Sequence, residues 1–163
     1  MKITKRTRTK AVLSNLDEKR LEELCKVVER DKDTSLYAMS VAEFAEVADG
    51  TFFENLFRKE KRLVKAIAKY KAVKEDMEQF GEYLSSLQPP KTKEEKVASE
   101  GIDFPSLPER MCIDLVKFFS LHSFDEAEKH TIAEWLVIHK DEATSALYQR
   151  RHSEIVANER SGK

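Results

Sequence analysis

Three side chains that could bind a metal ion stand four residues apart: His122, Glu126 and His130. Residues at this spacing lie on one face of a helix, so such a set can chelate a metal. Ser123 is placed to cap the helix that carries Glu126 and His130, which would leave His122 outside it. No further ligand follows at a suitable spacing. We therefore expect exposed polar residues here and predict no metal site.

The residues that could perform acid–base or nucleophilic chemistry do not form a catalytic pattern either. The adjacent acids Asp125 and Glu126 would point in different directions from a helix and would not converge on one substrate atom. Cys25 and Cys112 stand far apart and are interpreted as buried thiols, although Cys112 could meet a histidine in space. His139 falls on an apolar helix face, which is typical of a hydrogen-bonded core or interface histidine. The sequence predicts neither an enzyme nor a cofactor.

The dominant element predicted from the sequence is one long amphipathic helix over residues 51–84. The segment has no proline, and its apolar residues recur at the helical period along its whole length. Thr51 and Glu54 have the spacing of a capping box directly after Gly50, which would fix the start of the helix. A helix of this length is a rod of roughly 45 Å, so its apolar stripe must be covered by other helices or by another chain. The predicted partner interface consists of Leu56, Leu63, Ile67, Tyr70, Met77 and, from the second half of the chain, Trp135.

One face of this long helix is predicted to be basic. Its cations are spaced by four, three and four residues and would project together: Arg58, Arg62, Lys65 and Lys69. A regular row of cations matches a phosphate backbone, and the basic residues at 1–10 could add salt-sensitive contacts. The same row would also suit an acidic protein surface or a solvated face, and no base-reading motif accompanies it.

Composition indicates an all-α fold. The 163 residues are 40% apolar with only four glycines and four prolines, which favours a helical bundle organised around the long helix. The predicted parts are a basic arm at 1–12, a helical half at 13–84, a proline-containing linker at 85–105, a second helical half at 106–158 and a tail at 159–163. No run approaches the ~18 apolar residues of a membrane span.

Capping boxes mark most of the predicted helix starts. A serine or threonine followed three residues later by glutamate precedes helices near 41–49, 107–120, 124–130 and 132–157, and Asn15 with Glu18 marks one near 16–30. Each half therefore runs from a medium helix through a short one to a long one.

Residues 118–151 combine an aromatic-rich helix, a short S-F-x-E-A-E helix and a longer helix with a Tyr/Arg-rich end. This block resembles the C-terminal part of small helical proteins encoded in bacteriophage tail modules, the tail-assembly chaperones and accessory virion proteins. The resemblance covers about a fifth of the chain and carries over no functional residue. It implies a helical assembly protein, located in the virion if the resemblance holds and otherwise in the cytoplasm.

The sequence thus favours a non-enzymatic interaction protein that binds another protein or a second copy of itself, in phage or prophage morphogenesis if the resemblance holds. The alternative is a nucleic-acid-associated protein that binds phosphates through the arm and the basic face at 58–74. We expect no membrane partner and identify no small-molecule substrate.

Overall fold

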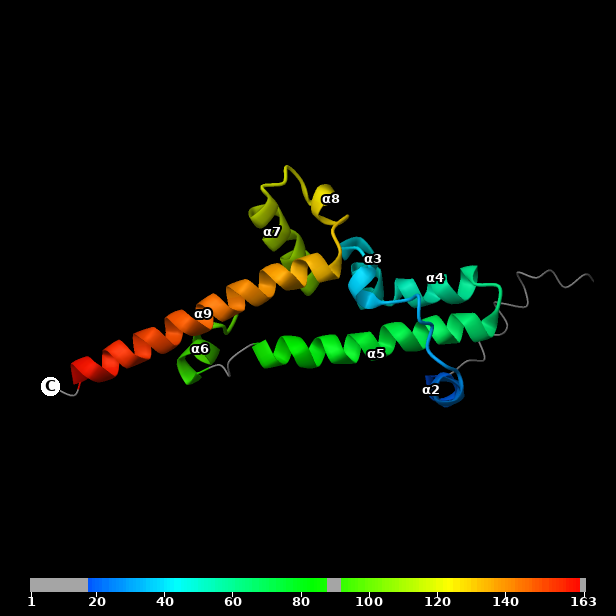
Figure 1. The fold of residues 1–163 in the computed structure, drawn as a ribbon, viewed down its shortest axis with the longest axis horizontal. Coiled ribbons are helices and arrows are strands. Elements are labelled where there is room, and N and C mark those ends of the chain that lie inside the picture. The colour runs from blue at the N-terminus through cyan, green and yellow to red at the C-terminus, as the bar shows by residue number, and fades with distance from the viewer. Residues whose placement is uncertain (1–17, 88–91, 162–163) are drawn as a thin grey trace, which may run out of the picture.

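The computed structural model describes residues 18–87 and 92–161, which are helical almost throughout (Figure 1). The elements in these residues are α2 (Glu18–Val27), the 3-10 turn η1 (Leu36–Ala38), α3 (Val41–Asp49), α4 (Thr51–Lys59), α5 (Leu63–Leu87), α6 (Lys93–Ala98), α7 (Leu107–Phe119), α8 (Phe124–Ala127) and α9 (Ile132–Ser161). The predicted all-α class is confirmed. The predicted arm at 1–12 and the predicted cap Asn15 lie outside the described residues.

Capping boxes begin several of the helices at the predicted positions. At α3 the Ser40 hydroxyl accepts the Glu43 N–H at 3.2 Å, while the Glu43 carboxylate accepts the Ser40 N–H at 2.9 Å. The same pairing at Thr92 and Thr131 begins α6 and α9. At the start of α7, both the N–H and the hydroxyl of Ser106 donate to the Glu109 carboxylate. Each box satisfies N–H groups for which the first turn of a helix has no internal acceptor.

Gly50 separates α3 from α4. Its φ of 87° is left-handed, which favours glycine, and its N–H donates to the Val47 carbonyl at 3.3 Å. The predicted capping box at Thr51 and Glu54 is wrong, because α4 starts at Thr51 itself and the Thr51 N–H donates to Oδ1 of Asp49 at 2.8 Å. Two helices that meet at a single glycine leave no extended residue with a side chain to serve as the cap.

The prediction of one unbroken helix over 51–84 is also wrong. The helix breaks at residues 60–62, where Glu60 takes an extended conformation with a ψ of 122°. After the break α5 runs back along α4, so the two form a helical hairpin (Figure 1). The longer arm, α5, continues to Leu87.

The physical reason for the break is that the hairpin covers one half of the apolar stripe with the other. Phe53 and Phe57 of α4 contact Tyr70 of α5, with ring centroids 4.9 and 6.0 Å apart. A straight rod would leave both halves of the stripe in water unless another chain covered them. The charged run at 58–62 has no apolar side chain, so turning there sacrifices no burial.

One apolar core joins the two halves of the chain. Its buried side chains include Leu36, Phe44, Phe80, Met111, Leu115, Ile132 and Trp135. Two backbone hydrogen bonds of 2.9 Å also connect the starts of α3 and α9, from the Val41 N–H to the His130 carbonyl and from the Ile132 N–H to the Met39 carbonyl. The second half is therefore packed against the first, which fixes where α7 and α9 lie.

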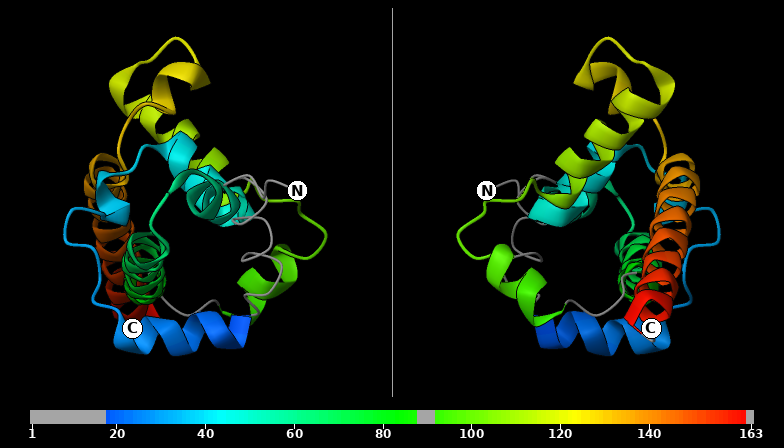
Figure 2. Two further views of the ribbon diagram at one scale, coloured as in Figure 1. Left: turned by 90° about the vertical axis from the view of Figure 1, so that its right-hand side faces the viewer. Right: turned by 90° about the vertical axis from the view of Figure 1, so that its left-hand side faces the viewer.

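A smaller cluster lies inside the hairpin and buries Phe57, Ala66 and Ile67. Leu21 and Leu24 of α2 pack against it, and α2 lies across α5 (Figure 2). The predicted linker at 85–105 is partly helical, since it contains the end of α5 and the whole of α6. Among the helices of 18–87 and 92–161, none has both the length and the apolarity needed to cross a bilayer.

Candidate functional site

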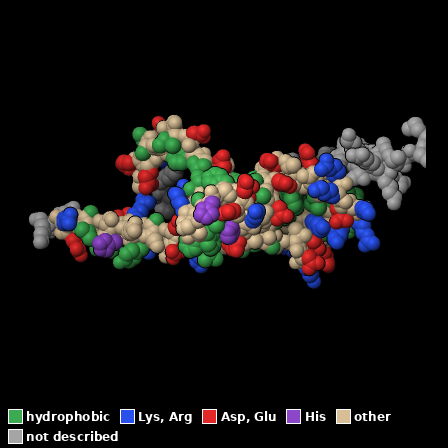
Figure 3. Space-filling view, turned by 90° about the horizontal axis from the view of Figure 1, so that it is seen from above, with side chains coloured by type: hydrophobic (Ala, Val, Ile, Leu, Met, Phe, Trp, Pro, Cys, Tyr) green, Lys and Arg blue, Asp and Glu red, His purple; other side chains and the backbone are tan. Residues whose placement is uncertain are grey.

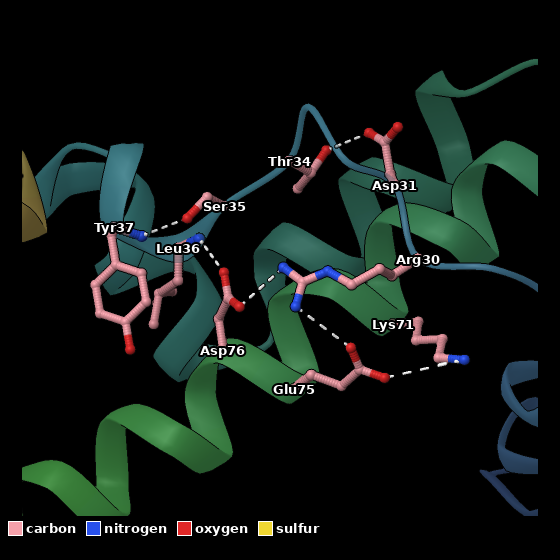
Figure 4. Close-up of polar contacts among 9 residues, drawn as sticks. All are labelled: Arg30, Asp31, Thr34, Ser35, Leu36, Tyr37, Lys71, Glu75 and Asp76. Carbon is pink, nitrogen blue, oxygen red and sulfur yellow. Dashed lines mark hydrogen bonds and ion pairs between the residues drawn. The ribbon is translucent and has the colours of Figure 1, made fainter.

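Asp76 of α5 is a buried acid, 4% exposed, at the centre of a polar cluster (Figure 4). Its Oδ2 accepts the Leu36 N–H at 2.9 Å, and its Oδ1 accepts from Nη2 of Arg30 at 2.9 Å. Arg30 also contacts Glu75 at 3.4 Å, and Glu75 lies 3.9 Å from the Lys71 ammonium. Because both oxygens of Asp76 bind groups of the chain itself, this cluster fastens the segment before η1 to α5.

Asp114 of α7 is a second buried acid, 3% exposed. Its Oδ2 accepts the Nε1–H of Trp135 at 3.1 Å, and its Oδ1 accepts from Nε of Arg110 at 3.1 Å. The ring of His139 stacks on Trp135, with centroids 4.5 Å apart and planes inclined by 16°. Burial lowers the pKa of His139 below its usual 6.5, although the charge of Asp114 acts in the opposite direction. Burial therefore favours the neutral form of the imidazole.

Glu142 brings a second carboxylate to the same place, one turn beyond His139 on α9. One ligand-type atom from each of Asp114, His139 and Glu142 lies within 4.8 Å of the other two, and no other such group of three occurs in 18–87 and 92–161. Sequence reasoning missed this cluster. The available signal was the spacing of His139 and Glu142, three residues apart on a helix, whereas Asp114 comes from a different helix.

The metal ligands considered from the sequence do not converge. The Glu126 carboxylate accepts the backbone N–H of His122 at 3.0 Å. The ring of His130 stacks on Phe119 with centroids 4.8 Å apart, and its Nδ1 lies 3.3 Å from the Glu134 carboxylate. His130 is thus paired with Glu134 and not with Glu126.

The two cysteine thiols are kept protonated by burial. Cys25 of α2 is half-buried and Cys112 of α7 is buried, and burial raises the pKa of both thiols. A raised pKa leaves little of the reactive thiolate at neutral pH. The two residues belong to separate apolar clusters, as expected for packing residues.

The six residues predicted as a partner interface do not form one exposed surface. Ile67 and Trp135 are buried in the chain's own clusters, at 2% and 0% exposed. Leu56, Tyr70 and Met77 are partly buried against the same clusters, and Leu63 is 41% exposed. The hairpin therefore uses most of this stripe internally.

The four predicted phosphate-binding cations lie on both sides of the helix break. Arg58 is in α4, Arg62 is in the turn, and Lys65 and Lys69 are in α5, so they form no straight row on one face. Lys69 pairs with Glu60 at 3.3 Å. The other three are exposed at the end of the molecule where α4 meets α5, and Lys and Arg side chains gather there (Figure 3).

The outer part of α9 is a long exposed helical surface. Ile138 is the last buried residue of this helix, and α9 continues for another 23 residues to Ser161. Figure 1 shows α9 extending beyond the end of α5. An open groove of 320 Å³ lies beside the packed part of α9 and is lined by Tyr37, Tyr83, Leu136, Val137 and Lys140.

Comparison with protein-family models, with curated proteins and with solved structures finds no match to this chain. Its function is therefore inferred from the residues and their geometry.

Proposed function

We propose that the protein is a non-enzymatic assembly protein that binds another protein chain through the outer part of α9, residues 141–160. The observation that carries this proposal is the unequal burial of the helix. Ile132, Trp135 and Ile138 are 0%, 0% and 3% exposed, whereas no residue at 139–160 is buried.

An exposed helical segment of this kind has little packing to stabilise it. Most helix stability in proteins comes from packing an apolar face rather than from the propensity of the residues. Residues 141–160 also include Thr144, Ser145 and the β-branched Ile155 and Val156, which have lower helix propensity than alanine. A partner that covers this segment would supply the missing packing.

The segment and the turn of α9 just before it carry exposed apolar side chains in a pattern that suits such a partner. Val137, Tyr148 and Ile155 are 72%, 70% and 57% exposed. Eleven residues are about three helical turns and seven are about two, so these three side chains lie on one face of α9. Val137 also lines the 320 Å³ groove. A partner helix in this groove would continue along the same face to Tyr148 and Ile155.

The resemblance of residues 118–151 to phage tail-module proteins supplies a setting for this proposal, the assembly of a virion. Assembly proteins in such a setting bind other proteins and need no catalytic group of their own.

Photocrosslinking in the cells that make the protein, at its native expression level, tests the proposal. A photoreactive phenylalanine analogue placed at Tyr148 or at Ile155 should give a protein adduct of one defined mass. The matched control carries the analogue at Ala48, an exposed residue of α3, and should not give that adduct. No adduct from either α9 position, or the same adduct from all three positions, would contradict the proposal.

A second candidate function, binding of nucleic-acid phosphates, is favoured by the charge at the turn between α4 and α5. Lys59, Lys61, Arg62 and Lys65 are exposed, and none forms an ion pair with another residue of 18–87 or 92–161. The first turn of α5 also carries no acid to offset them.

Mobility shifts measured across a salt series test this second function. Binding should weaken steeply as salt rises, because each phosphate contact releases counterions. The double variant Lys61→Glu, Arg62→Glu should abolish binding, whereas the double variant Lys117→Glu, Lys129→Glu, an equal charge reversal at two exposed residues in the second half of the chain, should leave most of it. Absence of a shift at low salt would rule this function out.

A further inference from the structure

Two carboxylates and one imidazole, all groups that can bind a metal ion, lie together where α7 packs against α9. Asp114 projects from α7, and His139 and Glu142 project from α9. One ligand-type atom of each lies within 4.8 Å of the other two. Asp114 is buried, His139 is half-buried and Glu142 is exposed, so the cluster opens from the core toward solvent.

Asp114 is held in place by two hydrogen bonds that leave its oxygens free to bind a metal ion as well. Trp135 and Arg110 each donate one hydrogen bond of 3.1 Å to a different oxygen of Asp114. A carboxylate oxygen has two lone pairs, so each oxygen keeps one for a further contact. Such outer hydrogen bonds are how proteins orient carboxylate ligands on metals.

His139 is prepared for the same role. Its ring is fixed by stacking on Trp135, and no other residue of the described ranges forms a hydrogen bond with its ring nitrogens.

Glu142 completes the set from the next turn of α9. Residues three apart on a helix lie on the same face, and a glutamate and a histidine at that spacing recur in metal sites built inside helical bundles. Ligands on a tetrahedral ion at about 2.0–2.1 Å lie roughly 3.3 Å from one another. The three ligand atoms lie within 4.8 Å of one another, so small side-chain rotations would bring them to that separation.

We propose that Asp114, His139 and Glu142 bind one divalent transition-metal ion of the zinc class, which ties α7 to α9. The histidine nitrogen favours this class, because Mg²⁺ and Ca²⁺ prefer oxygen ligands alone. Two carboxylates balance the two charges of the ion. The fourth ligand position is left to water.

Titration of the full chain with zinc chloride alone, after treatment with a chelator and its removal, tests this site. Calorimetry should give one zinc ion per chain, and zinc should raise the melting temperature because it binds the folded state. Glu142→Gln should weaken zinc binding by at least about tenfold and remove the rise in melting temperature. This variant should fold normally, because Glu142 is exposed.

Two control variants make the test specific. Asp141→Asn removes the neighbouring exposed acid of α9 and should leave zinc binding unchanged, and so should His130→Asn, which removes the ring paired with Glu134. Absence of saturable zinc binding, or equal binding by the Glu142→Gln and Asp141→Asn variants, would overturn the proposal. Loss of binding in His130→Asn alone would place the ion at His130 and Glu134 and would overturn it as well.

Discussion

The indole Nε1–H of Trp135 donates to Oδ2 of Asp114 at 3.1 Å and joins α9 to α7 inside the core. Trp135 is 0% exposed and Asp114 is 3% exposed, so neither group can turn to water if the other is removed. Each therefore depends on the other for its hydrogen bond. The packed part of α9, from which its exposed outer part extends, is anchored by this pair.

Trp135→Phe should lower the free energy of unfolding by about 1–3 kcal/mol, because it leaves Oδ2 of the buried Asp114 without a donor. Asp114→Ala should also destabilise the protein, since it leaves the indole N–H without an acceptor. Urea unfolding of the two single variants and the double variant measures both effects. The double variant should lose less than the sum of the two, and strict additivity would show that the pair does not interact.

Asp76→Ala should destabilise the fold by about 1–3 kcal/mol, because it leaves the buried Leu36 N–H without an acceptor and removes the 2.9 Å contact with Arg30. Its chain neighbour provides the control. Glu75→Ala should change the free energy of unfolding by at most about 1 kcal/mol, since Glu75 pairs with Arg30 where both side chains are 38% exposed. Equal effects of the two substitutions would mean that Asp76 does not fasten η1 to α5.

The glycines at 50 and 81 should respond to alanine in opposite directions. Gly50 has a φ of 87°, where a Cβ is strained, so Gly50→Ala should destabilise by about 1–2 kcal/mol. Gly81 lies inside α5 with nothing within 4 Å of an added Cβ, so Gly81→Ala should stabilise by about 0.5–1 kcal/mol. Thermal or urea unfolding compares the two, and a stabilising Gly50→Ala would contradict the left-handed junction between α3 and α4.

Acid should weaken the capping boxes. Hydrogen bonds from the hydroxyl and the N–H of Ser106 hold the pKa of Glu109 below its usual 4.5. The native state then binds fewer protons than the unfolded chain. The stabilisation is therefore complete above about pH 4.5 and is lost as the pH falls through the folded pKa.

Melting temperatures measured between pH 6 and pH 3 check this expectation. Glu109→Gln should make the loss of stability below about pH 4.5 less steep, because glutamine has no proton to take up there. Identical curves for Glu109→Gln and the wild type would refute the linkage.

Several helix starts could be predicted from the sequence because their determinants are local. Ser40 with Glu43 and Thr131 with Glu134 satisfy each other within a single turn, whatever the rest of the chain does. The break between α4 and α5 could not be predicted in this way. Residues 51–84 have helical periodicity on both sides of it, and only the contact of Phe53 with Tyr70 across the hairpin shows why the chain turns.

The candidate sites were less predictable than the fold, because they depend on which helix faces meet. The sequence predicts Ile67 in a partner interface because it is apolar, but Ile67 is buried in the same cluster as Phe57 of the chain's own α4. Asp114 was not considered, since its link to Trp135 exists only after α7 packs on α9. The exposed face of α9 that carries Val137 and Tyr148 could not be predicted from the sequence, because it depends on which face of α9 packs against the core.

Amide hydrogen exchange along α9 tests the central claim most directly. In purified protein, at a concentration where light scattering gives a monomer, the amides at 135–139 should exchange slowly, because they follow the buried Ile132, Trp135 and Ile138. The amides at 145–160 should exchange with little protection, since none of the other residues of 18–87 and 92–161 buries that segment. Equal, strong protection along the whole of α9 in the monomer would show that the outer helix needs no partner, and would contradict its assignment as a docking segment.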